Sequence, residues 1–204
     1  MLKRAVVAVG CLVLLASAAY GFALDADLRP TTLMMEEVGG LVAAYNDANG
    51  AGISYPRFGW GGELRMGFIE SMRVHPVVGV RGVIASSGTD REAVTASAAG
   101  AFAGIEISLG AWSAAFDLGA YRAQFDFSAG GYDDLSGWSA GGLAMVAYRW
   151  KLTRLLRASV GLTVNYLQVS ELKDREGGLF GSRTGAILDF SGFGLTIGIG
   201  WNSP

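Results

Sequence analysis

Seven charged residues of this 204-residue chain lie in segments that otherwise alternate between apolar and small polar residues. They are Glu63, Arg65, Arg81, Glu106, Arg122, Arg149 and Arg157. A carboxylate or guanidinium that is enclosed away from bulk water must pair with an opposite charge or stay hydrated. These residue types therefore point to ion-pair chemistry. They would form either a structural network or the charged lining of a narrow, gated path for ions or small solutes.

Residues for enzyme chemistry are scarce. His75 is the single histidine, and no Ser–His–acid triad can be placed around it. The chain has no Walker loop, no dinucleotide fingerprint and no His-rich cluster. The run Asn46-Asp47-Ala48-Asn49-Gly50 lacks the remaining ligands of a calcium loop and reads as a turn. We therefore expect no catalytic residue, no cofactor and no metal site.

The charged residues are positioned by strands. From Leu156 to Tyr166 the even positions are apolar and the odd positions, Arg157 to Asn165, are polar, which is alternation at period two. Strands of about ten residues with one apolar face are typical of membrane-spanning barrels. Eight such strands are predicted: Thr32–Ala44, Phe58–Glu70, Val74–Ala85, Val94–Leu109, Ala114–Ser128, Ser136–Trp150, Leu156–Ser170 and Ile187–Trp201.

The connections between these strands alternate in length. Three short turns separate four longer connections, of which the most charged spans residues 171–186. Short turns on one side and long loops on the other predict an outer-membrane topology with both termini on the turn side. The fold class is therefore all-β, as an eight-stranded antiparallel up-and-down transmembrane β-barrel.

Three observations place the apolar face outside. After the predicted leader the chain has only two lysines, Lys151 and Lys173, which is too little charge for an exterior exposed to water. The polar face is rich in Gly and Ser, as a narrow lumen requires. Aromatic residues gather near both strand ends, as at two membrane–water interfaces. The seven charged residues, and His75, are thus predicted to line the lumen.

Two strands do not fit cleanly. In the fifth strand, Phe116 and Leu118 share a face with Arg122, so a bulge near Gly119 is predicted to restore alternation. In the first strand, Glu36 and Glu37 are adjacent and would point to opposite faces, so one glutamate lies on the apolar face whichever face is taken as apolar. In the lumen, Glu63 is expected to meet Arg81 on the neighbouring strand and Arg122 across the bore. Replacing Glu63 by Gln is then expected to raise conductance.

The start of the chain has the layout of a secretory signal peptide. Lys3 and Arg4 precede an apolar run, and small residues follow it, so residues 1–23 are predicted to be a leader and residues 24–204 the barrel domain. Cys11, the only cysteine, lies inside that run and leaves the barrel without disulfides. Removing Lys3 and Arg4 leaves 14 basic residues against 18 acidic ones, which argues against nucleic acid as a partner.

The apolar stripe Leu156–Tyr166 and the stripe Phe193–Trp201, each opposed by a polar face, make the chain resemble the small eight-stranded outer-membrane barrels. These are the OmpA-type transmembrane domain and its OmpX- and OmpW-like relatives. In that family an aromatic residue commonly ends the chain and is read by the assembly machinery, whereas here Trp201 is followed by three more residues.

The resemblance implies a non-enzymatic protein of the outer membrane, with a structural or surface-interaction role through its long loops. Because side chains fill the interior of an eight-stranded barrel, a lumen plugged by a Glu/Arg network is also expected. The alternative is a narrow pore or a carrier of ions or small hydrophobic solutes; a lipid-modifying enzyme is a third hypothesis. The expected partners are outer-membrane lipid, the barrel assembly machinery and surface ligands of loops 45–57 and 171–186.

Overall fold

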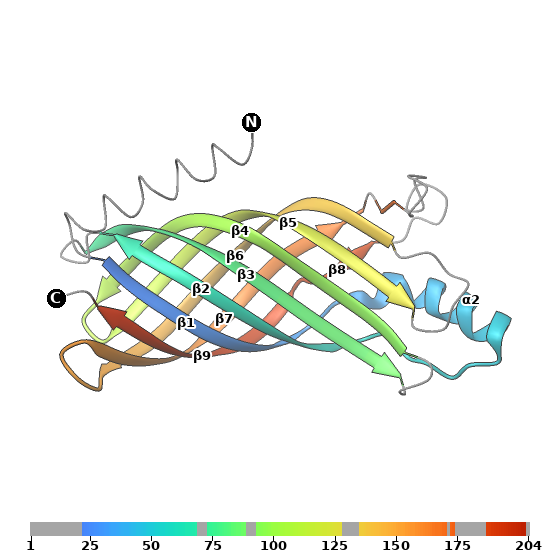
Figure 1. Ribbon diagram of the computed structural model, residues 1–204, viewed down its shortest axis with the longest axis horizontal. Coiled ribbons are helices and arrows are strands. Elements are labelled where there is room, and N and C mark those ends of the chain that lie inside the picture. The colour runs from blue at the N-terminus through green and yellow to red at the C-terminus, as the bar shows by residue number, and fades with distance from the viewer. Residues whose placement is uncertain are drawn as a thin grey trace.

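The computed structural model describes residues 22–68, 73–88, 93–127, 135–170, 172–173 and 187–202. Within these residues, eight long strands form one antiparallel sheet that closes on itself (Figure 1). They are β1 (Phe22–Thr32), β2 (Phe58–Phe68), β3 (Val74–Gly88), β4 (Ala93–Leu109), β5 (Trp112–Phe127), β6 (Leu135–Lys151), β7 (Leu156–Val169) and β9 (Gly192–Asn202). The expected fold class, an eight-stranded antiparallel barrel, is confirmed.

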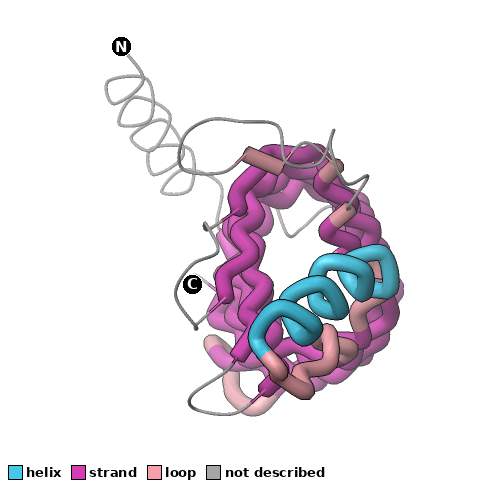
Figure 2. The backbone as a smooth tube through the Cα atoms, turned by 90° about the vertical axis from the view of Figure 1, so that its right-hand side faces the viewer, coloured by secondary structure: helices cyan, strands magenta, loops and turns pink. Residues whose placement is uncertain are grey.

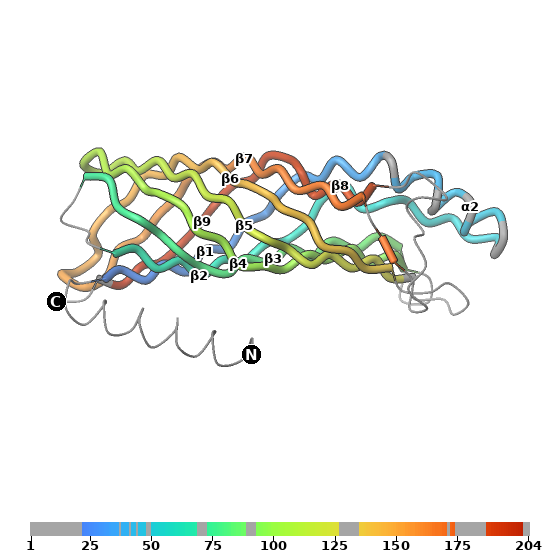
Figure 3. Tube along the Cα trace, turned by 90° about the horizontal axis from the view of Figure 1, so that it is seen from above, coloured from blue at the N-terminus to red at the C-terminus, as the bar shows by residue number. Residues whose placement is uncertain are grey.

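The barrel closes because β1 pairs with both β2 and β9, while β7 pairs with both β6 and β9. A two-residue strand, β8 (Leu188–Asp189), adds to the loop-side end of β7. Closure satisfies the backbone groups that an open sheet would leave unpaired at its edges. Figure 3 shows the strands crossing the barrel axis at a steep tilt, as a closed barrel requires.

The two ends of the barrel differ. The starting end of β1 and the final end of β9 lie together, since Ala23 faces Asn202, and the turns at residues 110–111 and 152–155 lie at the same end. The opposite end carries the connection between β1 and β2, which contains the 3-10 helix η1 (Met35–Val38) and the helix α2 (Gly39–Asn49). Figure 2 shows α2 lying over part of this mouth.

The first strand was placed wrongly by sequence. The predicted strand Thr32–Ala44 is η1 and most of α2, whereas the actual first strand is Phe22–Thr32. In β1, Leu24 and Leu28 are exposed and alternate with buried Asp25 and Arg29, so the period-two signal is present there. This period-two pattern overlaps the end of the predicted leader, residues 1–23. Residues 1–21 of that leader fall outside the described residues.

The predicted bulge near Gly119 is also wrong. β5 pairs with β4 without interruption from Trp112 to Phe127. The other six strands lie within a few residues of their predicted positions, except that the last is divided into β8 and β9. Their apolar faces point outward in the turn-side half, as at Leu64, Val80 and Leu162, each more than half exposed.

Two groups of outward-facing aromatic residues border this face. At the turn-side end, the ring of Trp112 contacts Tyr148 edge-on at 5.2 Å and the ring of Phe22 contacts Trp201 at 5.4 Å between centroids. Towards the loop side, Phe58 and Trp60 pack at 5.7 Å. Such aromatic girdles flank the apolar band of membrane barrels. Among the described residues no helix is long and apolar enough to cross a membrane.

Candidate functional site

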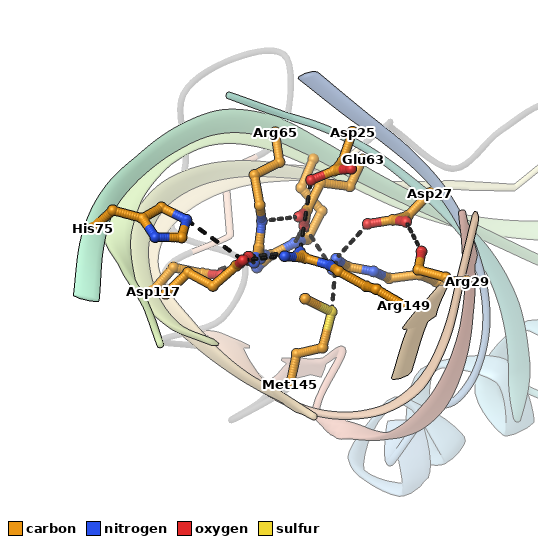
Figure 4. Close-up of polar contacts among 12 residues, drawn as sticks. Asp25, Asp27, Arg29, Glu63, Arg65, His75, Asp117, Met145 and Arg149 are labelled. Carbon is orange, nitrogen blue, oxygen red and sulfur yellow. Dashed lines mark hydrogen bonds and ion pairs between the residues drawn. The ribbon is translucent and has the colours of Figure 1, made fainter. Parts of the chain in front are cut away.

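The charged side chains of the turn-side half meet inside the barrel, where alternate residues of each strand point (Figure 4). The centre of this network is Glu63 on β2, whose side chain is fully buried. Its carboxylate lies 2.6 Å from Arg29 on β1, 2.8 Å from Arg65 on the same strand and 2.6 Å from Arg81 on β3. Glu63 and Arg81 are direct partners in register.

Asp117 on β5 is the second carboxylate of this centre. It accepts hydrogen bonds from Arg65 at 3.0 Å and from Arg81 at 2.9 Å, and its side chain is fully buried. Arg81 also donates to the hydroxyl of Tyr121 at 3.0 Å and lies 4.5 Å above the centre of the Phe102 ring. Carboxylates, a hydroxyl and an aromatic face together hold the two guanidinium groups in fixed positions.

The network continues towards the turn side. Glu106 on β4 accepts two hydrogen bonds from Arg149 on β6, one of them at 2.7 Å, and lies 3.5 Å from both Arg65 and His75. Asp25 on β1 pairs with Arg157 at 2.7 Å and approaches Arg149 at 3.6 Å. Contacts therefore run without a break from Arg157 on β7 to the centre around Glu63.

The charges of this network balance. Its carboxylates are Asp25, Asp27, Glu63, Glu106 and Asp117, and its guanidinium groups are Arg29, Arg65, Arg81, Arg149 and Arg157. Each of these carboxylates lies within 4 Å of at least one guanidinium, so none is buried alone. We call these ten residues the charged layer. Its balance matters because a buried charge without a partner would cost several kcal/mol.

The loop-side half of the barrel is filled differently. Here the buried side chains are apolar and come from the strands, from η1 and α2, and from the segment before β9. We call this set the apolar layer: Leu33, Met35, Val38, Val42, Tyr45, Ile53, Ala85, Val94, Ala96, Ala98, Tyr121, Ala123, Phe125, Leu135, Leu167, Val169, Leu172, Leu188 and Phe190. Phe125 and Phe190 are completely buried in it. The helix across the mouth is thus fixed by burial of its apolar residues.

A small cavity of about 50 Å³ lies between the two layers. Arg29 and Arg81 border it from the charged layer, and Leu167 and Phe190 border it from the apolar layer. A volume of this size holds one to a few water molecules. Within the described residues, the arrangement can support ion pairing and occlusion, and no group of three or more His, Cys, Asp or Glu residues is placed to hold a metal ion.

Six of the seven charged residues expected in the lumen are found there, and Arg122 is not. Arg122 is exposed on the outside of β5, so its expected approach to Glu63 does not occur and Asp117 takes that place. The cause is the unbroken register of β5, which keeps Arg122 on the face of Phe116 and Leu118. His75 lies inside, as expected, near the turn-side end.

Sequence reasoning missed four members of the charged layer. Asp25, Asp27 and Arg29 lie on β1, which was not recognised as a strand. Their alternation with Leu24, Ala26 and Leu28 was the available signal. Asp117 shares its face of β5 with Tyr121 and Phe125, which were taken to be lipid-facing, so it was left out of the lumen set. That face is the inward one along the whole strand, and no bulge is needed.

No protein-family profile and no curated protein sequence matches this chain. Several solved structures are similar in fold, and two of them follow. The attachment invasion locus protein Ail of Yersinia pestis, in complex with the heparin analogue sucrose octasulfate, has a TM-score of 0.54 at 10% identity and covers 90% of this chain and 99% of its own. The outer membrane protein OprG from Pseudomonas aeruginosa has a TM-score of 0.50 at 10% identity, covering 90% of this chain and 95% of its own.

At such low identity the likeness concerns the fold alone. It agrees with the closed antiparallel sheet, the outward apolar face and the flanking aromatic residues described above. The chain therefore has the fold of the small outer-membrane β-barrels.

Proposed function

We propose that this chain is a non-enzymatic integral protein of an outer membrane, closed to solutes, which acts structurally or through its surface loops. The apolar outward face and its aromatic borders support the membrane location. The observation that carries the closed state is the double filling of the interior. A solute would have to pass the apolar layer and then the charged layer, and each consists of side chains buried against one another.

A surface role follows from what remains accessible. If the bore is closed, contact with other molecules falls to the lipid-facing wall and to the connections at the loop-side end. The segment 45–57 presents exposed Asp47 and an exposed Arg57 that stacks on Tyr55. Surface ligands of this segment and of residues 171–186 remain proposals; of the latter segment, only 172–173 are among the described residues.

The absence of enzyme activity is also a proposal. His75 lies 3.5 Å from Glu106, a carboxylate that is already occupied by Arg149, and this pair lies at the end of the barrel away from α2. A general base needs a free approach to its substrate. The leader at residues 1–23 and engagement by the barrel assembly machinery likewise stay predictions from the sequence.

Planar-bilayer recording of the refolded protein tests the closed state. We expect no open-pore conductance from the wild type. Glu63→Gln alone should also conduct little, because the apolar layer still excludes water, and this revises the expectation from sequence. Combining Glu63→Gln with Phe125→Ser and Phe190→Ser should wet both layers and raise the conductance.

Arg122→Gln serves as the matched control, since it removes one charge from the outside of the same barrel and should leave the current unchanged. Heat-modifiable migration on gels establishes that each variant is folded. Open-pore conductance in the wild type would overturn the proposal and favour a pore or carrier instead.

A further inference from the structure

A groove runs over the outer wall of the barrel across β2, β3 and β4. Its floor consists of Gly62, Gly82 and Ala99, which are successive partners in register and present almost no side chain. Leu64 and Val80 border it on the turn side. Two adjoining hollows of about 710 and 440 Å³ share these three floor residues.

The upper part of the groove, which is the part nearer the loop-side end of the barrel, is bordered by aromatic and polar residues. Trp60 and Ile84 form one side, and Arg122 and Gln124 form the other. Trp60 belongs to the aromatic residues on the loop side, and Arg122 is the register partner of Trp138, whose side chain is 68% exposed. The upper part therefore lies where amphipathic rings mark a membrane–water interface.

Arg122 is unusual for its position. Along the described parts of the eight long strands, outward-facing charge is confined to Arg122 and Asp126. Lys151, the last residue of β6, has the inward register of Arg149 and is exposed because it lies at the end of the barrel. Asp126 has an interaction elsewhere, whereas Arg122 makes no hydrogen bond or ion pair with any residue of the described part of the chain. A guanidinium left free beside an apolar groove at an interface is complementary to an anionic headgroup joined to an acyl chain.

We propose that this groove binds one anionic, phosphate-bearing lipid of the surrounding leaflet, an inference that rests on the proposed membrane location. An acyl chain lies along Gly62, Gly82 and Ala99, where it restores the dispersion contacts that a void would lose. The phosphate accepts hydrogen bonds from the guanidinium of Arg122, with the amide of Gln124 beside it. A second barrel packed on these small residues is disfavoured, because it would enclose Arg122 without a partner.

Native mass spectrometry of the refolded protein in detergent tests this. The protein is mixed with equal amounts of phosphatidylglycerol and phosphatidylcholine that carry the same acyl chains. We expect one retained lipid, with phosphatidylglycerol preferred about fivefold, the effect expected of one basic side chain near an anionic lipid surface. Arg122→Gln should abolish the preference but not the retention, and Arg122→Lys should keep part of the preference.

Filling the groove should abolish retention of both lipids. Gly82→Leu is suited to this because a Cβ at Gly82 would lie 3.5 Å from the carbonyl oxygen of Ala98 and 3.8 Å from the Cβ of Ala99, which are ordinary contacts. Ala99→Leu is a second variant of the same kind. Ala158→Leu, on the outward face of β7 away from the groove, is the matched control and should retain lipid as the wild type does.

Several results would overturn the proposal. They are a headgroup preference that survives Arg122→Gln, a retention that survives both Gly82→Leu and Ala99→Leu, and displacement of the lipid by excess inorganic phosphate, which would indicate a site for free anions. A dimer that Gly82→Leu dissolves would show that a second copy occupies the groove. A folded, heat-modifiable protein that inserts into vesicles but retains no lipid would refute the groove alone, whereas failure to insert would refute the membrane location.

Discussion

The turn-side and loop-side halves of this barrel have opposite chemistry on both faces. In the turn-side half, charged residues fill the interior and apolar side chains cover the exterior. In the loop-side half, apolar residues fill the interior, and the exterior carries polar residues on β4 and β5 beside the exposed aromatic residues Trp60 and Trp138. Strand β5 passes through both halves. In its turn-side part Asp117 is buried and Leu118 is exposed, whereas in its loop-side part Phe125 is buried and Arg122 is exposed.

The comparison shows that the strand does not turn over between the two halves. Its pairing with β4 is continuous, so the inward face remains the inward face along the whole strand. In the proposed membrane location, the surroundings of the outward face change along the strand, from an apolar solvent to a wet one. Lipid demands apolar residues outside and leaves the polar ones to the lumen. Above the lipid, the strand obeys the rule of a soluble barrel, with its apolar residues inside.

Strand β4 repeats this reversal independently. Glu106 is buried and Ile105 exposed in its turn-side part, whereas Val94, Ala96 and Ala98 are buried near its loop-side end. Thr95, which lies between them, faces outward and contacts Ser86 of β3 at 3.3 Å. Two adjacent strands therefore change chemistry while keeping register, which argues for a change of solvent and against a local defect in one strand.

Removing charge from the charged layer should have the largest effect. Glu63→Leu leaves Arg29, Arg65 and Arg81 without their shared carboxylate and is expected to destabilise the fold by about 3–5 kcal/mol. Phe125→Leu, the matched change in the apolar layer, should cost less than about 1.5 kcal/mol because it stays apolar. Urea unfolding of both variants in lipid vesicles measures the difference. Equal stabilities would mean that the two interiors do not differ in the way proposed here.

An inserted charge should distinguish the two exteriors. Leu162, 66% exposed on β7, lies in the apolar band, so Leu162→Arg should cost about 2–4 kcal/mol. Gln124 lies on the loop-side exterior of β5, where Gln124→Arg should change the stability by no more than about 0.5 kcal/mol. The same unfolding assay applies. A large loss of stability in Gln124→Arg would place this position in lipid and move the border between the two halves towards the loop-side end.

The sequence predicted what depends on strict alternation. The faces of β2, β3, β6 and β7 follow from it, because in these strands the outward face is apolar wherever it meets the expected membrane. The reversal in β5 was misread as a bulge near Gly119, since alternation alone does not show where the solvent changes. The pairing of Glu63 with Arg81 needed only neighbouring strands, but its pairing with Arg29 needed β1.

The first strand and the apolar layer were not predictable in the same way. Pro30 and the adjoining apolar leader obscured the strand Phe22–Thr32, because proline is rare in the interior of a sheet. The buried residues of η1 and α2 have no strand period, and their burial depends on the barrel mouth that receives them. The apolar residues of this helix are explained by their contacts with the folded barrel, and the local sequence pattern does not show these contacts.

The orientation of the two halves can be tested without disturbing the fold. Asp47 is exposed on α2 at the loop-side end, and Leu152 is exposed in the turn between β6 and β7. Replacing either surface residue by Cys should change the stability by no more than about 0.5 kcal/mol. A membrane-impermeant maleimide should label Asp47→Cys in intact cells, whereas Leu152→Cys should react only after lysis.

This labelling also assigns a compartment to each half. A barrel with an even number of long strands has both its ends and its short turns on one side, so the helix-bearing connection must lie on the other. Labelling of Leu152→Cys in intact cells, with Asp47→Cys protected, would reverse the barrel in the membrane. The polar exterior around Gln124 and Asp126 would then face the periplasm, and a surface role for the segment 45–57 would be lost. The contrast between the two halves would survive, because it depends on where lipid ends and not on which compartment follows it.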